Sequence, residues 1–300
     1  MSGKTRVGFV GLGNVGTPMS RNLLQTGFEV VGYDLVENPE FVAAGGRLAE
    51  SLQALAAEVP VIVQSLPTSE AVASSIEAIE AAAEEGTVLI DISSYPLQEK
   101  LANARRLAGR GITLLDCEIS GLPHMVADRT AVVFQSGDAE VVERLAPVFA
   151  GMTEQSFYLG EFGAATKMKL FANAMVCVHN AVSAEILNLA SNSGVDPALL
   201  VEVLGKSAAA SATFRAKAPI MLSRDFERGA GPFRHMFHYL ERISDLADSV
   251  GAGTPLIAAT KALYDAARDE GRHDQDIAAI IELLEQSGKE SADKGLSPNG

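Results

Sequence analysis

Two kinds of segment alternate through the first half of the chain. Short runs rich in β-branched residues predict strands, which are expected at Arg6–Val10, Glu29–Tyr33, Val59–Ser65, Thr87–Ile92, Thr113–Asp116 and Thr130–Gln135. Longer stretches rich in alanine and leucine predict helices between them, at Thr17–Thr26, Ser51–Ala57, Ser69–Glu84, Leu97–Gly109 and Ala139–Ala150. This alternation favours a doubly wound α/β domain, in which helices cover both faces of a mainly parallel sheet.

The second half predicts helices alone. No strong helix breaker occurs from Gly163 to Ser193, so one helix of about 45 Å is expected. Its apolar side chains wrap most of its circumference, which predicts burial at an interface. Further helices are expected at Ala198–Lys206, Phe214–Leu222, Met236–Val250, Pro255–Glu270 and Asp274–Glu285, followed by a polar, frayed tail over Ser287–Gly300.

These patterns predict two domains. We expect a Rossmann-type dinucleotide-binding domain over residues 1–162 and an all-α C-terminal domain over residues 163–300, which begins with the long interdomain helix. The length of 300 residues and the hydrophobic share of 47% suffice for two cores of this kind.

Charge and cysteine content narrow the class of protein further. The formal net charge of -14 disfavours binding to nucleic acids and to anionic membranes. Cys117 and Cys177 make neither a disulfide framework nor a zinc site, and they suit a reducing compartment. No signal peptide is evident, and the most apolar long segment, Leu170–Ala184, is too short to span a bilayer. We therefore expect a cytoplasmic protein without a metal centre.

A glycine motif follows the first predicted strand and opens the first predicted helix. It consists of Gly11, Leu12, Gly13, Asn14, Val15 and Gly16. The first glycine permits a tight turn, the second lets the backbone approach a pyrophosphate, and the third lets the helix pack on the strand. Asp34 ends the next strand, 18 residues after Gly16, where a carboxylate binds the ribose hydroxyls of NAD and repels the 2′-phosphate of NADP. The alternative is a glycine-rich turn that binds no nucleotide.

With these residues the chain resembles the β-hydroxyacid dehydrogenase family, which includes 3-hydroxyisobutyrate dehydrogenase and tartronate semialdehyde reductase. The segment Gly8–Met19 is similar to the opening motif of the family, and four more blocks follow in the family's order, so that the resemblance covers about Arg6 to Leu284. In the second block, Leu66 and Pro67 match a turn beside the cofactor. In the third block, Ser93 matches a hydroxyl near the nicotinamide ribose. The alternatives are that Pro67 only ends a loop and that Ser93 only caps a helix.

The fourth block, Asp116–Pro123, resembles the strand and loop that bind the substrate in the family. There, the backbone N–H groups of a Ser-Gly-Gly sequence hold the substrate carboxylate, and the matching residues here are Ser120, Gly121 and Leu122. Leu122 stands where a second glycine is usual, and Pro123 has no N–H group to offer. An altered substrate is therefore an open alternative.

The fifth block, Gly163–Asn173, resembles the catalytic block of the family, and its spacing selects Lys169 and Asn173. These two residues share one face of the long helix because they stand four positions apart. A desolvated lysine can exchange the proton that alcohol oxidation releases, and its ammonium form can stabilise an alkoxide during reduction. The alternative is a lysine that extends from the helix into water. In a later helix, His238 stands where the family has a lysine near the active site, and it is either a substrate-binding donor or a structural histidine.

The resemblance implies an oxidoreductase that transfers a hydride between NAD and a small β-hydroxyacid, or the matching semialdehyde or ketoacid. It also implies a homodimer or homotetramer. Two other functions stay open. An imine reductase of the same fold is disfavoured by Lys169, which such relatives usually lack, and a non-catalytic NAD-binding relative is suggested by the departures at Leu122, Pro123 and His238.

Overall fold

The computed structural model describes residues 5–227 and 231–286. Its contacts divide the chain into two compact units, and the division falls inside one long helix, after Lys169. The domain boundary after residue 162 stays a prediction, and the tail over residues 287–300 lies outside the described residues.

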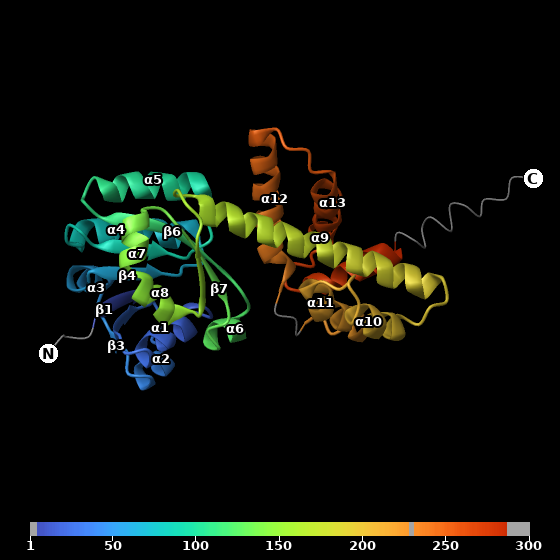
Figure 1. Ribbon diagram of the computed structural model, residues 1–300, viewed down its shortest axis with the longest axis horizontal. Helices are drawn as coiled ribbons and strands as arrows, with labels where there is room; N and C mark the ends of the chain where they lie inside the picture. Colours follow the sequence, from blue (N-terminus) through green and yellow to red (C-terminus); the bar gives the residue numbers. More distant parts are fainter. Residues whose placement is uncertain (1–4, 228–230, 287–300) are drawn as a thin grey trace, which may run out of the picture. The chain divides into compact units, whose positions relative to one another are not determined.

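Within the described residues, unit 1 contains a single sheet of eight strands (Figure 1). The strands are β1 (Arg6–Val10), β2 (Glu29–Tyr33), β3 (Arg47–Leu48), β4 (Val61–Gln64), β5 (Val88–Asp91), β6 (Thr113–Ser120), β7 (Val132–Ser136) and β8 (Gln155–Tyr158). Their order is β3-β2-β1-β4-β5-β6-β7-β8, and every neighbouring pair is parallel except β6 and β7. The mainly parallel sheet predicted from the sequence is therefore confirmed.

Helices cover both faces of this sheet, each over its own hydrophobic core. The helices of unit 1 are α1 (Gly16–Gln25), α2 (Pro39–Ala43), α3 (Leu52–Glu58), α4 (Ser69–Ala82), α5 (Leu97–Ala108), α6 (Pro123–Ala127), α7 (Ala139–Arg144) and α8 (Ala146–Met152). One core joins α1, α6, α7 and α8 to side chains such as Phe9 and Val63. The other joins α3, α4 and α5 to side chains such as Ile62 and Leu89. Neighbouring residues of one strand thus point into different cores, which explains why β4 and β5 are apolar throughout their middle.

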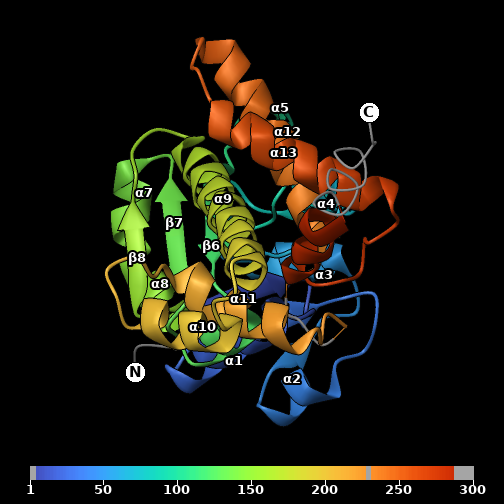
Figure 2. The same cartoon turned by 90° about the vertical axis from the view of Figure 1, so that its right-hand side faces the viewer.

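The structure differs from the predicted elements in several places. The strand predicted over Thr113–Asp116 continues to Ser120, because its polar end residues pair with β7. The helix predicted over Ala139–Ala150 is two helices, since Pro147 lies in the first turn of α8 and proline cannot extend a preceding helix. The sequence analysis missed β3, which has two residues, and β8, which is an exposed edge strand without an apolar run (Figure 2).

Unit 2 is helical in its described residues, as the sequence predicts. The long helix α9 (Ala164–Asn192) starts in unit 1 and continues into unit 2, where α10 (Pro197–Gly205), α11 (Ala212–Ser223), α12 (Phe233–Val250) and α13 (Pro255–Asp269) follow. The helix predicted from Asp274 starts later: a short 3-10 helix, η1 (Ile277–Ala279), leads into helical residues 280–286. Asp276 causes the delay, because its side chain caps η1 and its backbone pairs with Pro232.

The helix α9 has the length and the apolar composition of a membrane-spanning segment. The most apolar window has a mean hydropathy of 1.4, and half of that window is buried within the protein. The argument that Leu170–Ala184 is too short therefore does not extend to the whole helix, which has 29 residues. Core helices of globular domains share these properties. The expectation that the protein does not bind membranes stays a prediction.

Candidate functional site

The glycine motif forms a tight turn between β1 and α1. Gly11 has a φ of +86°, and a Cβ atom on it would lie 2.1 Å from the carbonyl oxygen of Ser65. A Cβ atom on Gly16 would lie 1.8 Å from the carbonyl oxygen of Gly11. Both positions therefore require glycine. Around Gly13, in contrast, no described atom lies within 4 Å of the place of a Cβ atom, so this part of the turn is open to a ligand.

The turn also presents donors and a carboxylate of the kind that bind a dinucleotide. No side chain among the described residues caps α1 at Val15, and its first turn contains no acidic residue, which leaves N–H groups and the positive helix end available to phosphate. The Leu12 N–H donates to Asp34 Oδ2 over 2.6 Å. This bond holds the Asp34 carboxylate, at the end of β2, beside the glycine turn.

The two other predicted cofactor blocks meet at the ends of β4 and β5. The Leu66 N–H donates to Ser93 Oγ over 3.0 Å, and the Ser93 N–H donates to Asp91 Oδ1 over 3.0 Å. Ser93 does not cap a helix, since α5 begins at Leu97 with Pro96 before it. Pro67 is exposed next to Leu66. The structure therefore brings both blocks together at the carboxyl edge of the sheet, where ligands bind in folds of this class.

Lys169 lies against the end of the next strand, β6. Its Nζ donates to the carbonyl oxygen of Ile119 over 2.7 Å, so the amine binds protein rather than extending into water. Burial among protein atoms lowers the pKa of Lys169, and the charge of Glu118 opposes that shift in part. Ser120 and Gly121 follow Ile119 directly, and Leu122 precedes α6 with its side chain 37% exposed. The candidate base thus shares one strand end with the candidate substrate loop.

A buried carboxylate holds the start of α9 in place, and with it the backbone from which the Lys169 side chain extends. Asp116 Oδ2 accepts hydrogen bonds from the N–H groups of Gly163 and Thr166 over 3.1 and 3.0 Å, and Oδ1 accepts from Thr166 Oγ1 over 2.7 Å. Burial by itself raises the pKa of Asp116, but the ammonium of Lys100 and these hydrogen bonds outweigh it, so that this pKa is lowered. The sequence analysis did not identify this function of Asp116.

The sequence analysis also did not identify the buried pair of Lys100 and Glu118 next to Asp116. The fully buried Lys100 binds Asp116 Oδ1 over 2.9 Å and Glu118 Oε1 over 3.0 Å. A signal was present in the sequence, because Asp116 and Glu118 are acidic residues at alternate positions of one buried strand and must therefore face the same side. Their partner in α5 was not predictable from local spacing.

The remaining predicted residues lie on unit 2. Asn173 follows Lys169 by one helical turn on the same face of α9; its side chain is buried, and its Nδ2 has no hydrogen-bond partner within residues 5–227 and 231–286. His238 lies on α12 with its side chain 71% exposed, and its Nδ1 is 3.7 Å from Glu241 Oε2. The structure thus shows a buried amide with an unused donor within the described residues, and an exposed histidine beside an acidic neighbour.

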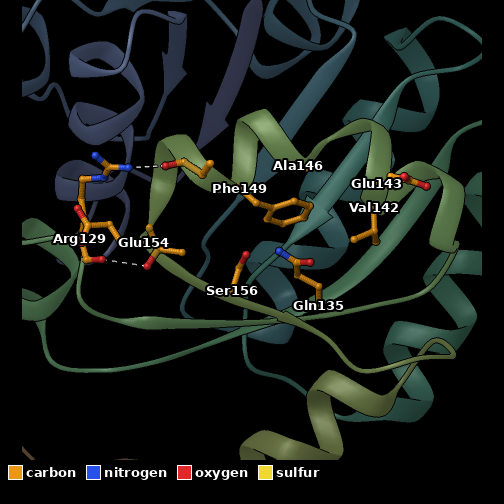
Figure 3. A pocket seen from close by; sticks show the side chains of 10 residues that line it. Arg129, Gln135, Val142, Glu143, Ala146, Phe149, Glu154 and Ser156 are labelled. Carbon is orange, nitrogen blue, oxygen red and sulfur yellow. Dashed lines mark hydrogen bonds between the residues drawn. The ribbon is translucent and has the colours of Figure 1, made fainter.

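A cavity of about 430 Å³ lies elsewhere in unit 1, between the β7–β8 edge and the helices α7 and α8 (Figure 3). Phe149 and Gln135 line it, and the guanidinium of Arg129 at its end donates to the carbonyl oxygen of Ala150. It contains none of the predicted site residues. In the described part of the chain, no group of three or more His, Cys, Asp or Glu side chains is placed to hold a metal ion.

Comparisons with known proteins show the family of the chain. The family described as the NAD binding domain of 6-phosphogluconate dehydrogenase matches residues 6–160, and the family described as the NAD-binding domain of NADP-dependent 3-hydroxyisobutyrate dehydrogenase matches residues 163–284. The chain is 30% identical to 2-(hydroxymethyl)glutarate dehydrogenase of Eubacterium barkeri, over 95% of this chain and 97% of that protein.

The fold is also similar to that of solved structures. A 3-hydroxyisobutyrate dehydrogenase of Mycobacterium tuberculosis, solved with L-serine, superposes with a TM-score of 0.84 and 27% identity, over 94% of this chain and 99% of that chain. An imine reductase of Myxococcus stipitatus, solved with NAD+, superposes with a TM-score of 0.61 over 94% of this chain and 99% of that chain. At 14% identity, this second likeness shows the fold alone.

Proposed function

Because the chain belongs to the β-hydroxyacid dehydrogenase family, we propose that it transfers a hydride between NAD and a small β-hydroxyacid, or the matching semialdehyde or ketoacid. The observation that carries the proposal is the amine of Lys169, which is partly buried, has a lowered pKa and lies at the strand end that leads into the candidate substrate loop. The two dehydrogenases named above are named for compounds that carry a hydroxyl and a carboxylate, which supports the substrate class.

Lys169 is the proposed general acid and base. Oxidation of an alcohol sends a hydride to the bound nicotinamide and releases a proton from the hydroxyl oxygen. A neutral Lys169 amine accepts that proton, and burial, which lowers the pKa of Lys169, favours this neutral form. In the reverse direction the ammonium stabilises the developing alkoxide and then donates its proton to it. Asn173, on the same helix face, orients the amine or the substrate oxygen without adding charge.

The substrate carboxylate is proposed to bind to the backbone N–H groups of Ser120 and Gly121. Leu122 narrows this loop with an apolar side chain where a glycine would leave space, and Pro123 offers no N–H group. We therefore expect a small substrate whose group next to the carboxylate tolerates an apolar neighbour. His238 is the proposed further contact from α12.

The cofactor site fits a dinucleotide. The pyrophosphate would bind to the backbone N–H groups of Gly13, Asn14 and Val15 at the uncapped start of α1, and Leu12 would line the same turn. Leu66, Pro67 and Ser93 would lie beside the nicotinamide end. Asp34 accepts from the Leu12 N–H and has lone pairs left for ribose hydroxyls. Since its charge would repel a 2′-phosphate, NAD is the proposed cofactor rather than NADP.

The alternatives have less support. Imine reductases of this fold usually lack the lysine at this position. Here Lys169 is present, and its amine donates to the carbonyl oxygen of Ile119. A non-catalytic protein that only binds NAD does not explain why that amine has a lowered pKa. We further propose a cytoplasmic homodimer or homotetramer with a dinucleotide-binding domain over residues 1–162 and a helical domain over residues 163–300.

The test is Lys169→Ala, with Lys167→Ala as the matched control on the exposed side of the same helix. Both variants are assayed against a panel of β-hydroxyacids, semialdehydes and cyclic imines with NAD and NADP, by absorbance of the reduced nicotinamide. We expect Lys169→Ala to lose at least about 100-fold in kcat, the usual contribution of a general acid or base, with NAD affinity nearly unchanged. Lys167→Ala should behave as wild type.

Near-normal turnover of a hydroxyacid by Lys169→Ala would contradict the proposed mechanism. Turnover of cyclic imines without turnover of any hydroxyacid would favour the imine reductase. Tight binding of NAD without turnover of any compound in the panel would favour the non-catalytic alternative.

A further inference from the structure

Glu118 lies inside strand β6 at a place where an ionised carboxylate is unusual. Its side chain is 3% exposed, and α5 places the ammonium of Lys100 3.0 Å from its Oε1. The other oxygen, Oε2, accepts a hydrogen bond from Ser94 Oγ over 2.5 Å. Both oxygens are therefore held, and the carboxylate cannot rotate without breaking one of two buried contacts.

The strand connects this carboxylate directly to Lys169. Glu118 precedes Ile119, and the carbonyl oxygen of Ile119 accepts the hydrogen bond from Lys169 Nζ. Glu118 and Lys169 also act on each other through their charges. Burial raises the pKa of Glu118, and burial lowers the pKa of Lys169, while the opposite charge of each one opposes the shift of the other. Burial thus moves the two pKa values toward each other, and the attraction between the two charges resists this movement.

We propose that Glu118 is a positioning residue that sets the protonation state of Lys169, and that Lys100 and Ser94 hold its carboxylate in place for this purpose. The inference rests on the proposed function in one respect only, namely that Lys169 exchanges the substrate proton. Glu118 itself contacts two side chains of the protein and is assigned no contact with substrate.

The other charged groups around the pair stay in fixed charge states. Lys100 stays protonated, because Glu118, Asp116 and Asp91 outweigh the effect of burial and raise its pKa. Asp116 stays ionised, because its pKa is lowered. Burial and the neighbouring Asp91 raise the pKa of Tyr95, which donates to Asp91 over 2.6 Å and therefore stays neutral. Cys117 also stays neutral, since burial raises its pKa. The charge of Glu118 opposes the effect of burial on the pKa of Lys169.

Removal of the charge of Glu118 therefore has a definite sign. In Glu118→Gln the amine keeps its burial but loses the carboxylate that favours the ammonium, so the pKa of Lys169 falls further. Oppositely charged neighbours commonly account for about one to three pH units, so we expect the midpoint to fall by about one unit. At a pH above the midpoints of both wild type and Glu118→Gln, the substitution changes the neutral fraction of Lys169 little. At lower pH the neutral fraction is larger in Glu118→Gln than in wild type.

The first measurement does not need a substrate. Competitive labelling of the full chain with acetic anhydride at a series of pH values, read by mass spectrometry of the Lys169 peptide, gives the titration midpoint of this amine. We expect a lower midpoint in Glu118→Gln than in wild type. Glu118→Asp, which keeps the charge, should have a midpoint closer to wild type. Glu99→Gln is the matched control, since it removes an exposed carboxylate from α5 and should leave the midpoint unchanged.

The second measurement is the pH dependence of kcat/KM in both directions with the hydroxyacid that gives the highest turnover. In Glu118→Gln the midpoint for oxidation and the midpoint for reduction should both move to lower pH, because one group controls both. A merely structural role of Glu118 would lower the rate or the melting temperature and leave both midpoints in place.

An unchanged labelling midpoint in folded Glu118→Gln overturns the proposal, whatever happens to turnover. If that variant does not fold, Ser94→Ala, which removes one of the two contacts that hold the carboxylate, is labelled instead, and a midpoint equal to wild type overturns the proposal as well. The two proposals fail separately. Full turnover by Lys169→Ala contradicts the proposed function even when the midpoint moves, whereas a fixed midpoint contradicts only the function assigned to Glu118.

Discussion

We propose that Asp34 selects NAD over NADP, since its negative charge would repel a 2′-phosphate. Its Oδ2 already accepts from the Leu12 N–H, and it lies at the end of β2 with its carboxylate partly exposed beside the glycine turn. Asp34→Asn keeps the shape and an acceptor for Leu12 but removes the charge. We expect NAD to bind roughly tenfold more weakly, since hydrogen bonds to a charged group contribute about 1.5–3 kcal/mol, and the preference for NAD over NADP to shrink.

Titration calorimetry with each nucleotide measures both effects. Glu37→Gln is the control, because it removes a negative charge from an exposed neighbour. If Asp34→Asn binds NAD as tightly as wild type and NADP no better, then Asp34 does not select the cofactor.

At the scale of residues, the sequence allowed us to predict the site residues that are recognised by a local motif or by their spacing along one element. The turn around Gly11 and Gly16 is such a case, because the clashes that require glycine come from Gly11, which directly follows the first predicted strand, and from Ser65, which ends the third. Lys169 was selected by spacing along one helix. Glu118 and Lys100 were missed because they are 18 positions apart, and their contact exists only when α5 packs on β6. Local patterns contain no information about that packing.

At the scale of elements, Asp116 is the residue that joins α9 to the sheet. Its carboxylate accepts hydrogen bonds from the N–H groups of Gly163, just before α9, and of Thr166, in the first turn of α9. It also pairs with Lys100. Asp116→Asn leaves Lys100 buried with one carboxylate fewer and weakens the acceptor for that turn. We expect a loss of about 3 kcal/mol in the free energy of unfolding, the usual effect of breaking a buried ion pair. Urea unfolding followed by circular dichroism measures this loss.

Asp138→Asn provides the contrast, because Asp138 caps α7 from an exposed position and the substitution should cost about 1 kcal/mol or less. A loss no larger in Asp116→Asn than in Asp138→Asn would contradict the function assigned to Asp116 as the anchor of α9.

The same carboxylate makes a pH dependence predictable. The pKa of Asp116 is lowered in the folded state, so its stabilising effect is fully present above the unfolded pKa of about 3.9 and is lost as the pH falls through the folded value. Wild type should therefore lose stability on acidification more steeply than Asp116→Asn, and the two unfolding free energies should converge at low pH. Parallel curves would contradict the lowered pKa.

The elements themselves were predictable where the apolar period was long. The strands β1 and β2 match the predicted ranges at both ends, because each begins at a charged residue and continues through β-branched, aromatic and glycine residues. The edge strand β8 was not predictable, since all four of its residues are exposed and no alternation distinguishes it from a loop. The antiparallel pairing of β7 was also missed, because strand direction depends on how the connection returns to the sheet.

At the scale of the whole molecule, the surface of α9 bears on assembly. The sequence predicts that this helix is buried at an interface, yet six large apolar side chains on it are exposed in the single chain: Met168, Phe171, Met175, Val182, Ile186 and Leu189. Their spacings of 3, 4, 7, 4 and 3 residues place them along one helical face. An apolar stripe of this kind is uncommon on a monomer and typical of a surface that binds another protein. We propose that a second copy of the chain covers it.

Ile186→Arg tests this assembly. A charge at the middle of an apolar stripe must be desolvated when two copies meet, so we expect the oligomer to dissociate into monomers at micromolar concentration while the helical content is retained. Light scattering coupled to size-exclusion chromatography measures the mass. Leu256→Arg is the matched control, because it places the same charge on α13 at a leucine that is 71% exposed and lies off the stripe. If both variants keep the mass of wild type, or if wild type is itself a monomer, then the stripe on α9 is not the contact between copies.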